Sequence, residues 1–531
     1  MYRTFGRRAE SAGFVVAVAA TALAAAACHD GSGELSPQRP NILFVVWDTV
    51  RADRMSLYGH RRETTPKVDA WAQQALVFDD AISAAGYTVP SHASMFTGLL
   101  PSEHCTSGEA STLGEEHTTL AELLRDAGYA TFLYSENPHL SSHRRLTQGF
   151  ERSEHPWSDR YFERALQILK QKVRGDRSSE LGERVAAMER GESELTPWNV
   201  KAAGSLAGEA LLDFLDELDP GRPFFAFINY MEAHRPYIPP RRFRERFMTS
   251  VEVEASYAVD RSWDAIWEFT FGARELSDED LMLTRATYDA ALLELDDLFA
   301  SLLDSLERRG VLDDTIVVLT ADHGEHLGEQ HMFDHQSTLY QPALRVPLVL
   351  YHRDLLPAAR SATPVMNFDL FPTLLELADV SVPENLHVSA RSLLAPSAER
   401  ERLAESITAQ SAGVIAMRRL HPGWDPTAWI RTQRALFRGR YKWIASSTGA
   451  NELYDLRADP GELHDVASLR EIDAASMRAA LERATSKLVA CSGGGAPAVD
   501  ERERELLQQL GYESSSEGEE SSNSEQRAGS R

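Results

Sequence analysis

Five short runs of apolar, β-branched and aromatic residues recur along this chain and constrain its fold more than any other feature. The runs are Asn41–Trp47, Thr131–Tyr134, Phe224–Tyr230, Thr315–Thr320 and Val346–Tyr351. Segments with a helical spacing of Leu and Ala, such as Thr119–Ala127 and Tyr288–Leu306, lie between them. Strands that are apolar on both faces and alternate with helices predict an α/β fold, in which helices cover both faces of a large, mainly parallel or mixed sheet. Reactive side chains are then expected at the carboxyl ends of the strands.

Composition and charge exclude several classes of protein. A chain of 531 residues with 43% hydrophobic and 25% charged residues is globular, not collagenous, coiled-coil or wholly disordered. The formal net charge of −25 repels polyanions, so nucleic acid is not expected as a partner. Three cysteines cannot form a disulfide framework. Cys105 and Cys491 are either a pair in an oxidising compartment or two unrelated thiols.

The first 28 residues have the pattern of a secretory signal. Three arginines precede an apolar, Ala-rich run that is too short to span a bilayer as a mature helix. Small residues stand directly before Cys28, as in a bacterial lipobox, although Ala25 occupies the position where Leu is usual. We expect a lipoprotein-type signal over residues 1–28, with plain secretion as the alternative, and a polar linker over 29–39. The protein is then expected in the bacterial cell envelope or secreted, with membrane attachment only through lipidation of Cys28.

The remaining chain is expected to form a catalytic domain and a smaller C-terminal subdomain. Residues 40–395 carry the predicted sheet, and the charge-rich segments 153–198 and 248–276 are predicted to be helical insertions over one end of it. Residues 396–490 are predicted to be an α+β subdomain, with short strands in Arg431–Ser447 and Glu452–Leu456 and an amphipathic helix over Ala474–Leu488. Residues 491–531 are predicted to hold a final helix and a disordered Ser/Glu-rich tail.

Metal-ligating side chains follow two of the predicted strands. Asp48 comes directly after the first strand, and Asp322 and His323 come directly after the strand that ends at Thr320. Carboxylates and an imidazole at the carboxyl ends of buried strands are good ligands for a divalent cation. Taken alone, Asp48 is better explained as a helix N-cap. For Asp322 and His323, the buried strand before them disfavours a merely solvated turn.

A hydroxyl suited to nucleophilic attack stands before a predicted helix. Thr88 lies two residues before Pro90, and Pro favours the first turn of a helix. The backbone N–H groups and the dipole at a helix N-terminus stabilise an anion, so the Thr88 hydroxyl is a candidate nucleophile. The alternative is that Thr88 only caps the helix. His92, one turn later, is expected either to face the nucleophile or to cap its helix.

Two further histidines are candidates for proton transfer. His234 follows the strand Phe224–Tyr230, and His335 ends a Phe-Asp-His sequence. Either could protonate a leaving oxygen or hold a transferred anion, although each alone is more often a surface or capping residue. Glu325 is interpreted as either a solvated residue or a base.

Taken together, these motifs resemble the sulfatase family of the alkaline phosphatase superfamily. The matching series is N-I-L-F-V-V-W-D-T-V-R-A-D, T-V-P-S-H-A-S-M-F-T-G-L-L-P, Y-M-E-A-H-R-P-Y-I-P-P, T-A-D-H-G-E-H-L-G-E and E-L-Y-D-L-R-A-D-P-G-E. Its order and spacing agree with the family from about Arg39 to Ala467. The resemblance implies a sulfatase-type fold and a metal-dependent hydrolase of sulfuric or phosphoric esters.

The nucleophile position departs from the family pattern. Sulfatases carry a Cys, or sometimes a Ser, at the start of C-x-P-S-R, and this residue is oxidised to formylglycine. Here Thr88 stands at that position and His92 replaces the Arg. A secondary alcohol cannot yield the aldehyde, so formylglycine chemistry is in doubt. The familiar G-K-W-H of sulfatases is also missing, and Asn137, which lies in its place, is expected to contact substrate.

The metal ligands depart from the sulfatase pattern as well. A Thr with Asp, Asp and His resembles lipoteichoic acid synthases and one metal site of the nucleotide pyrophosphatase/phosphodiesterases. The resemblance implies that Asp48, Thr88, Asp322 and His323 surround one divalent cation, which is Ca, Mn, Mg or Zn. A second cation is not expected, because the segment around His234 lacks the Asp-x-x-x-His pattern of those phosphodiesterases.

These departures predict a hydrolase of phosphate or phosphonate esters. Thr88 is expected to attack phosphorus while His234 or His335 assists the leaving oxygen. The alternatives are a sulfuric ester hydrolase, a phosphoglycerol-type transferase and a catalytically silent glycan- or envelope-binding protein. The substrate is expected to be a small-molecule, glycan or lipid ester, and the oligomeric state is left open.

Overall fold

The computed structural model describes residues 39–106, 111–173, 182, 185–187, 190–191, 203–335, 338–407 and 411–491. The predicted signal sequence lies outside these residues, as does all of the linker except Arg39. The C-terminal segment 491–531, with its predicted helix and tail, also lies outside them except for Cys491. Part of the predicted insertion at 153–198 lies outside them as well. In the part of the chain that is described, no helix is both long enough and apolar enough to cross a lipid bilayer.

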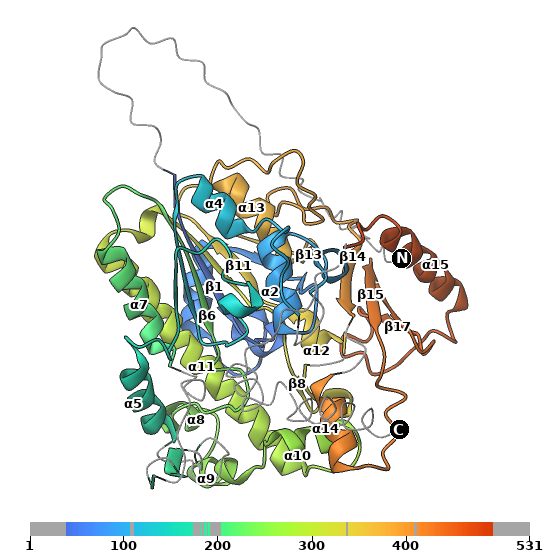
Figure 1. Ribbon diagram of the computed structural model, residues 1–531. Helices are drawn as coiled ribbons and strands as arrows, with labels where there is room; N and C mark the ends of the chain where they lie inside the picture. The colour runs from blue at the N-terminus through green and yellow to red at the C-terminus, as the bar shows by residue number, and fades with distance from the viewer. Residues whose placement is uncertain are drawn as a thin grey trace, which may run out of the picture. The chain divides into compact units, whose positions relative to one another are not determined.

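An eight-stranded sheet forms the centre of the structure (Figure 1). Its strands, in spatial order, are β12 (Ala359–Ser361), β2 (Leu76–Phe78), β11 (Leu348–Tyr351), β7 (Thr315–Thr320), β1 (Asn41–Trp47), β6 (Phe224–Tyr230), β4 (Ala130–Ser135) and β5 (Arg152–Glu154). The block from β7 to β5 is parallel, whereas β11 runs antiparallel to both β7 and β2. Strands therefore form at all five predicted runs, and the predicted α/β class is confirmed.

Alternate residues of β1 point to opposite helix layers. Phe44 lies beside Phe227 of β6, and both face the layer that contains α2 (Thr88–Thr97), whose Phe96 ring contacts Phe227. Trp47 points to the other layer, where its ring contacts Phe299 of α11 (Asp278–Arg309). Helices α4 (Leu120–Asp126) and α13 (Leu370–Leu377) pack beside α2, whereas α1 (Pro66–Trp71) and α7 (Ser205–Asp216) pack beside α11. Because every residue of β1 after Asn41 is buried, the strand reads as a continuous apolar run.

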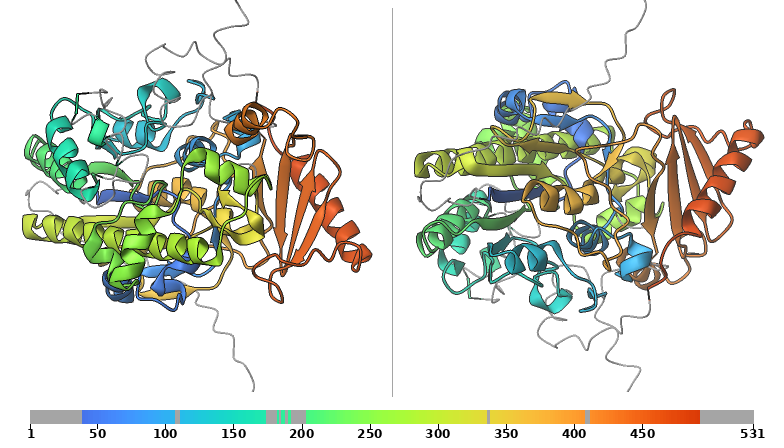
Figure 2. Two further views of the ribbon diagram at one scale, coloured as in Figure 1. Left: turned by 90° about the horizontal axis from the view of Figure 1, so that it is seen from below. Right: turned by 90° about the horizontal axis from the view of Figure 1, so that it is seen from above.

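The C-terminal region forms a second sheet, as Figure 2 shows. The strands β14 (Arg402–Ser406), β15 (Gln433–Arg438), β16 (Tyr441–Ser446) and β17 (Glu452–Asp455) are all antiparallel neighbours. Helix α15 (Glu471–Thr485) packs on this sheet. The predicted strands and helix are present, and β14 is an additional strand that the sequence analysis did not identify.

Smaller elements connect and cover these sheets. The helices are α3 (Pro101–His104), α5 (Phe162–Lys172), α8 (Arg241–Arg244), α9 (Ser250–Ala258), α10 (Trp263–Thr270), α12 (Gln341–Leu344) and α14 (Ala412–Leu420). The strands β10 (Arg345–Val346), β3 (Ala81–Ile82) and β13 (Val365–Met366) form a small sheet, and β8 (His326–Leu327) pairs with β9 (Phe333–Asp334). Helices α5, α9 and α10 lie in the two segments predicted to be helical insertions.

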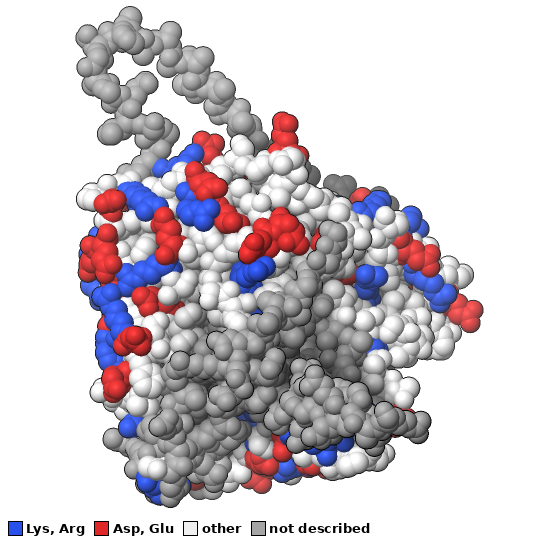
Figure 3. Space-filling model, in the orientation of Figure 1, with Lys and Arg blue, Asp and Glu red and all other residues white. Residues whose placement is uncertain are grey.

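A disulfide and a buried hydrogen bond join the C-terminal region to the catalytic part. Cys105, directly after α3, forms a disulfide with Cys491, which follows α15. Lys442 of β16 is fully buried, pairs with Glu462 at 2.6 Å and donates to the carbonyl oxygen of Leu339 at 2.5 Å. On the described surface visible in Figure 3, acidic and basic side chains are interspersed.

Candidate active site and metal centre

The register of the central strands brings Asp48 and Asp322 together. Strands β1 and β7 are parallel, and Val46 lies level with Thr320. Two residues further along each strand direction are Asp48 and Asp322, so both carboxylates emerge at the same level from the carboxyl edge of the sheet. Both are fully buried. The sheet itself therefore holds two carboxylates next to each other.

Asp48 is held by two amide groups. The side-chain amide of Asn137 donates to Oδ2 of Asp48 at 2.8 Å, and that of Asn229 donates to the same oxygen at 3.3 Å. The other oxygen, Oδ1, has no hydrogen-bond partner among the described residues. Burial, together with the nearby charge of Asp322, raises the pKa of Asp48 to about 7. Asn137, which was expected to contact substrate, contacts Asp48 in this structure.

As in Asp48, one carboxylate oxygen of Asp322 accepts hydrogen bonds and the other does not. Its Oδ1 accepts from the backbone N–H of Thr49 at 3.1 Å and from that of His323 at 2.8 Å. Its Oδ2 is buried and makes no hydrogen bond to any described group. Burial raises the pKa of Asp322. Gly324 follows closely, and a Cβ at Gly324 would lie 2.1 Å from the carbonyl oxygen of Pro342, so only glycine fits there.

The imidazole of His323 points its Nε2 atom at this pair of carboxylates. Its Nδ1 donates to the carbonyl oxygen of Gly324 at 2.9 Å, which leaves Nε2 as the acceptor. Nε2 lies 3.2 Å from Oδ2 of Asp322 and 3.3 Å from Oγ1 of Thr88. Burial, with a further contribution from His335, lowers the pKa of His323 to about 3, so its imidazole is neutral.

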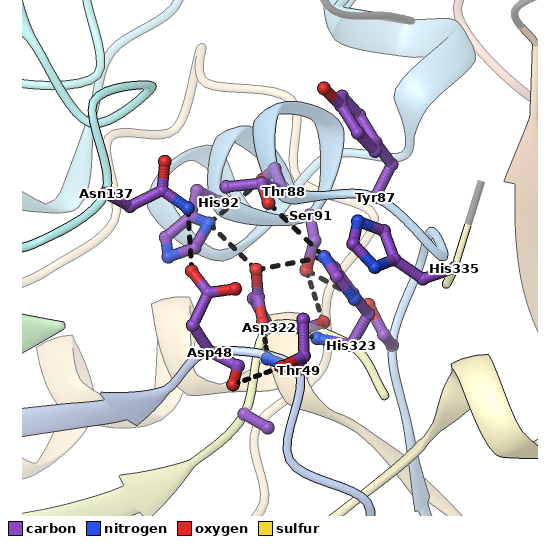
Figure 4. A network of polar contacts seen from close by, with 12 residues as sticks. Asp48, Thr49, Tyr87, Thr88, Ser91, His92, Asn137, Asp322, His323 and His335 are labelled. Atoms are coloured by element: carbon purple, nitrogen blue, oxygen red, sulfur yellow. Dashed lines mark hydrogen bonds and ion pairs between the residues drawn. The ribbon is translucent and has the colours of Figure 1, made fainter. Parts of the chain in front are cut away.

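Thr88 is the first residue of α2, and its hydroxyl does not cap the helix. The N-cap residue is Tyr87, no side chain caps the helix start, and the Thr88 hydroxyl points to Nε2 of His323 (Figure 4). His92, one turn later, donates from Nδ1 to the carbonyl oxygen of Thr88 at 2.9 Å and lies 3.6 Å from Oδ2 of Asp322. Burial lowers the pKa of His92. His92 therefore lies between the nucleophile candidate and the carboxylates.

This arrangement fits a divalent cation. Asp48, Asp322 and His323 each offer one ligand atom, and these atoms all lie within 4.8 Å of one another. The unpaired oxygens of Asp48 and Asp322 are buried polar atoms whose desolvation a cation would compensate. The Nδ1 contact of His323 with a backbone carbonyl is the usual orientation of a metal-ligating histidine. The residues predicted as ligands thus lie in one cluster, with the Thr88 hydroxyl beside it.

The two remaining histidines lie on one side of this cluster. The ring of His335 lies 4.2 Å from that of His323, and the ring of His234 lies 5.7 Å from that of His335, measured between centroids. Asp334 and Glu325 are buried beside His335. Glu325 is only 1% exposed, so its interpretation as a solvated residue is wrong.

Several residues of the site were missed by sequence reasoning. Thr49 has a φ of 60°, a conformation that a β-branched residue rarely adopts, and this aims its N–H at Asp322. Asn229 lies inside a buried strand, where an amide is itself a signal because it needs a partner. Asp334 directly precedes His335 and could have been noted as a second Asp-His pair after Asp322-His323.

Comparison with known families identifies two matching regions. Residues 40–380 match the Sulfatase family, and residues 328–489 match the family described as N-sulphoglucosamine sulphohydrolase, C-terminal. The first match covers the large sheet and every residue of the site described above. The second covers the antiparallel C-terminal sheet.

Individual relatives span most of the chain. An N-acetylglucosamine-6-O-sulfatase from Bacteroides thetaiotaomicron is 25% identical, over 84% of this chain and 85% of the relative. A choline-sulfatase from Rhizobium meliloti is 24% identical, over 81% of this chain and 82% of the relative. Among solved structures, a phosphonate monoester hydrolase from Agrobacterium radiobacter superposes with a TM-score of 0.66 at 22% identity, over 84% of this chain and 95% of that one.

Proposed function

Because this chain belongs to the sulfatase family of ester hydrolases, we propose that it hydrolyses phosphate or phosphonate esters with the Thr88 hydroxyl as its nucleophile. One observation carries the proposal. The Thr88 hydroxyl lies at the start of α2, 3.3 Å from Nε2 of His323, next to two buried carboxylates. A hydroxyl at a helix N-terminus beside a cation site is poised to ionise and attack an electrophilic phosphorus.

The residue type argues against the usual sulfatase chemistry. Thr88 cannot be converted to the aldehyde that formylglycine requires, so the attacking group must be the unmodified alcohol. The fold itself permits attack on phosphorus, because the structurally similar protein from Agrobacterium radiobacter is a phosphonate monoester hydrolase. Direct attack by Thr88 is therefore the simplest reaction for this set of residues.

A divalent cation held by Asp48, Asp322, His323 and Thr88 would supply positive charge that favours ionisation of the hydroxyl and attracts the anionic ester. The Thr88 hydroxyl releases its proton to solvent, its oxygen bonds to phosphorus while the bond from phosphorus to the leaving oxygen breaks, and a threonyl phosphoryl ester forms. In this proposal His234 or His335 gives a proton to the leaving oxygen. Water then attacks phosphorus, the bond between phosphorus and the Thr88 oxygen breaks, phosphate or phosphonate leaves, and a proton from the attacking water restores the Thr88 hydroxyl.

Sulfate ester hydrolysis is the second candidate. It is favoured by the two relatives that are 25% and 24% identical to this chain, both of which are named as sulfatases. Sulfate and phosphate esters are both tetrahedral anions, so one site can admit either. The two candidate functions are distinguished by comparing the rates of hydrolysis of a phosphorus ester and a sulfate ester that carry the same leaving group.

The proposal extends to substrate class and location. The substrate is a small-molecule, glycan or lipid ester, and the site takes one cation for this reaction. The protein acts outside the cytoplasm, either anchored through a lipidated Cys28 or free. The disulfide between Cys105 and Cys491 supports this location, because disulfides persist in oxidising compartments.

Turnover on matched substrates tests the proposal. The chain without its signal sequence is assayed with one aryl leaving group on a phosphate monoester, a phosphodiester, a phosphonate monoester and a sulfate ester. Thr88→Val keeps the shape of the side chain and removes the hydroxyl. Thr97→Val is the matched control, because Thr97 lies at the other end of the same helix and its hydroxyl only donates to the carbonyl oxygen of Ala93.

Two results decide the outcome. Turnover of a phosphorus ester that is lost in Thr88→Val and kept in Thr97→Val supports the proposal, as does a phosphothreonine found at position 88 after acid quench. Turnover of the sulfate ester alone, or turnover that Thr88→Val does not change, overturns it.

A further inference from the structure

The structure contains a second cluster of buried ligand atoms beside the first. Strands β8 and β9 form a short hairpin in which His326 lies opposite Asp334. Extending this register by one residue places Glu325 opposite His335. Glu325, Asp334 and His335 are at most 5% exposed. Each offers one ligand atom, and these three atoms lie within 4.8 Å of one another.

The second cluster repeats the local geometry of the first. In Asp322-His323, the backbone N–H of the histidine donates to Oδ1 of the preceding aspartate at 2.8 Å. In Asp334-His335, the same bond is 2.7 Å. In both pairs the other carboxylate oxygen, Oδ2, is buried and has no hydrogen-bond partner in the described structure. Asp334 adopts a φ of 68°, an uncommon conformation that sets the direction of this carboxylate.

Unpaired atoms point to a ligand between these side chains. Besides Oδ2 of Asp334, Nε2 of His335 is buried without a hydrogen bond to a described residue, whereas Nδ1 of His335 lies 2.7 Å from Oδ1 of Asp334. Tyr237 donates to Oε2 of Glu325 at 2.5 Å, and Oε1 lies 3.9 Å from Nδ1 of His335. Opposite ligands of one cation are separated by up to about 4.8 Å at bond lengths of about 2.0–2.4 Å, so the cluster has the dimensions of a metal site.

The balance of charge favours a second cation. Asp48, Asp322, Glu325 and Asp334 are four buried carboxylates. One divalent cation beside Asp48 and Asp322 would leave Glu325 and Asp334 balanced chiefly by His335, whose Nδ1 lies 2.7 Å from Oδ1 of Asp334, and buried charge that is not fully balanced is costly. The nearby guanidinium of Arg51 is already paired with Asp53 and Glu329. Arg235, which also lies close, donates to the carbonyl oxygen of Arg261 and stacks on Trp263.

We propose that Glu325, Asp334 and His335 bind a second divalent cation next to the one held by Asp48, Asp322 and His323. The rings of His323 and His335 are 4.2 Å apart, so the two ions would be neighbours, as in two-metal hydrolases. One imidazole and two carboxylates suit Zn²⁺ or Mn²⁺ better than Ca²⁺ or Mg²⁺. The site goes beyond the one-cation reaction proposed above and gives His335 the role of a ligand.

Metal content tests the proposal without any substrate. The chain without its signal sequence is stripped with EDTA, reloaded separately with Zn²⁺ and Mn²⁺, and freed of excess ion by gel filtration. Metal per chain is then measured by inductively coupled plasma mass spectrometry. Two equivalents of either ion in the unaltered protein are expected, and one equivalent or fewer with both ions overturns the proposal.

Variants assign the second equivalent to its ligands. Asp334→Asn and His335→Gln are each expected to lower the content from two equivalents to one, and Asp48→Asn is expected to do the same through the first site. Glu329→Gln is the matched control, because Glu329 is a nearby carboxylate that pairs with Arg51 and should leave two equivalents. Two equivalents in both Asp334→Asn and His335→Gln would overturn the assignment.

A variant that fails to fold must be distinguished from one that has lost only a metal ligand. Circular dichroism and the melting temperature report whether a variant is folded, and the count in the unaltered protein needs no variant. Because no step depends on turnover, inactivity on every ester would reject the proposed hydrolysis and leave the metal count intact.

Discussion

Oγ1 of Thr88 lies 3.3 Å from Nε2 of His323, although 235 positions separate the two residues in the chain. The contact exists because α2 begins at Thr88 directly over the edge of the sheet where β7 ends. The imidazole of His323 therefore lies close to both an alcohol and a carboxylate, because its Nε2 is also 3.2 Å from Oδ2 of Asp322.

Thr88→Ser is expected to keep turnover within about tenfold of the unaltered protein, because the hydroxyl stays at the start of α2. Thr88→Val is expected to lose at least about a thousandfold, the scale of a removed nucleophile. The measurement is kcat on the best phosphorus ester. If Ser loses as much as Val, a hydroxyl at position 88 is not sufficient for the reaction, and the expectation for Thr88→Ser is contradicted.

Asn137→Ala is expected to weaken cation binding by about 10- to 100-fold, because Asn137 holds Oδ2 of Asp48 and so orients the carboxylate. Isothermal titration calorimetry with Mn²⁺ or Zn²⁺ measures the change. Asn451→Ala is the control, since Asn451 accepts from the backbone of Ser446 in the C-terminal sheet. Equal affinities in Asn137→Ala and the unaltered protein would contradict the role given to Asn137, and a rise in KM alone would return it to substrate binding.

Cation affinity is expected to increase with pH up to about 7 and then to level off. Burial and the charge of Asp322 raise the pKa of Asp48 to about 7, so below that pH a proton must leave before a cation can bind. Each pH unit below 7 therefore lowers affinity by up to about tenfold. Calorimetry at pH 5.5, 6.5 and 7.5 in two buffers of different ionisation enthalpy measures both the affinity and the proton released.

Asp53→Asn is the control for this pH dependence. Burial alone would raise the pKa of Asp53, but Arg51 outweighs it and lowers the pKa to about 2, so Asp53 is ionised throughout this range. The variant should keep the slope of affinity against pH. An affinity in the unaltered protein that does not change between pH 5.5 and 7.5 would contradict the state assigned to Asp48.

Lys442→Met is expected to destabilise the protein by about 3–5 kcal/mol, because it leaves the fully buried carboxylate of Glu462 without its partner. Burial lowers the pKa of Lys442 and raises that of Glu462, each against the effect of the partner charge. The cost of burying the two charges thus outweighs their mutual attraction. The double variant Lys442→Met/Glu462→Leu should therefore recover most of the stability that Lys442→Met loses. Urea unfolding of both variants measures this, and a double variant less stable than the single one would contradict it.

Removal of the disulfide by Cys105→Ser/Cys491→Ser is expected to cost about 2–4 kcal/mol. The melting temperature of the unaltered protein should fall when dithiothreitol is added, whereas that of the double variant should not respond. A melting temperature that is the same with and without reductant in both proteins would show that the bond does not stabilise the fold.

The sequence was most informative where periodicity and strand ends coincide. The observed limits of β1, β6 and β7 are those of the predicted apolar runs, because the residues of buried parallel strands are nearly all apolar, with Asn229 of β6 as an exception. Asp48 and Asp322 could be found because they directly follow such strands. The pairing of these strands also explains why residues so far apart converge at one edge.

Other parts depend on contacts that no local pattern reveals. Strands β8 and β9 have two residues each, too few for a period of two to be visible, so the approach of Glu325 to His335 was not predicted. The direction of Asn137 is set by a turn after β4 that aims its amide at Asp48. The left-handed backbone of Thr49 is imposed by Asp322 and Ala233, whose oxygens bind its N–H and hydroxyl.

The level alignment of Asp48 and Asp322 limits how this chain can vary in length. Side chains of a strand alternate between faces, so one inserted or deleted residue within β1 or β7 would turn one carboxylate toward the helix α11 and away from Thr88. A change of two residues would return the carboxylate to the face of the sheet that Thr88 covers, but it would shift the carboxylate by two residues along the strand direction. Insertions and deletions are therefore tolerable in the loops but not in these two strands, and the chain length between the start of each strand and its aspartate is fixed by the spacing of the ligands.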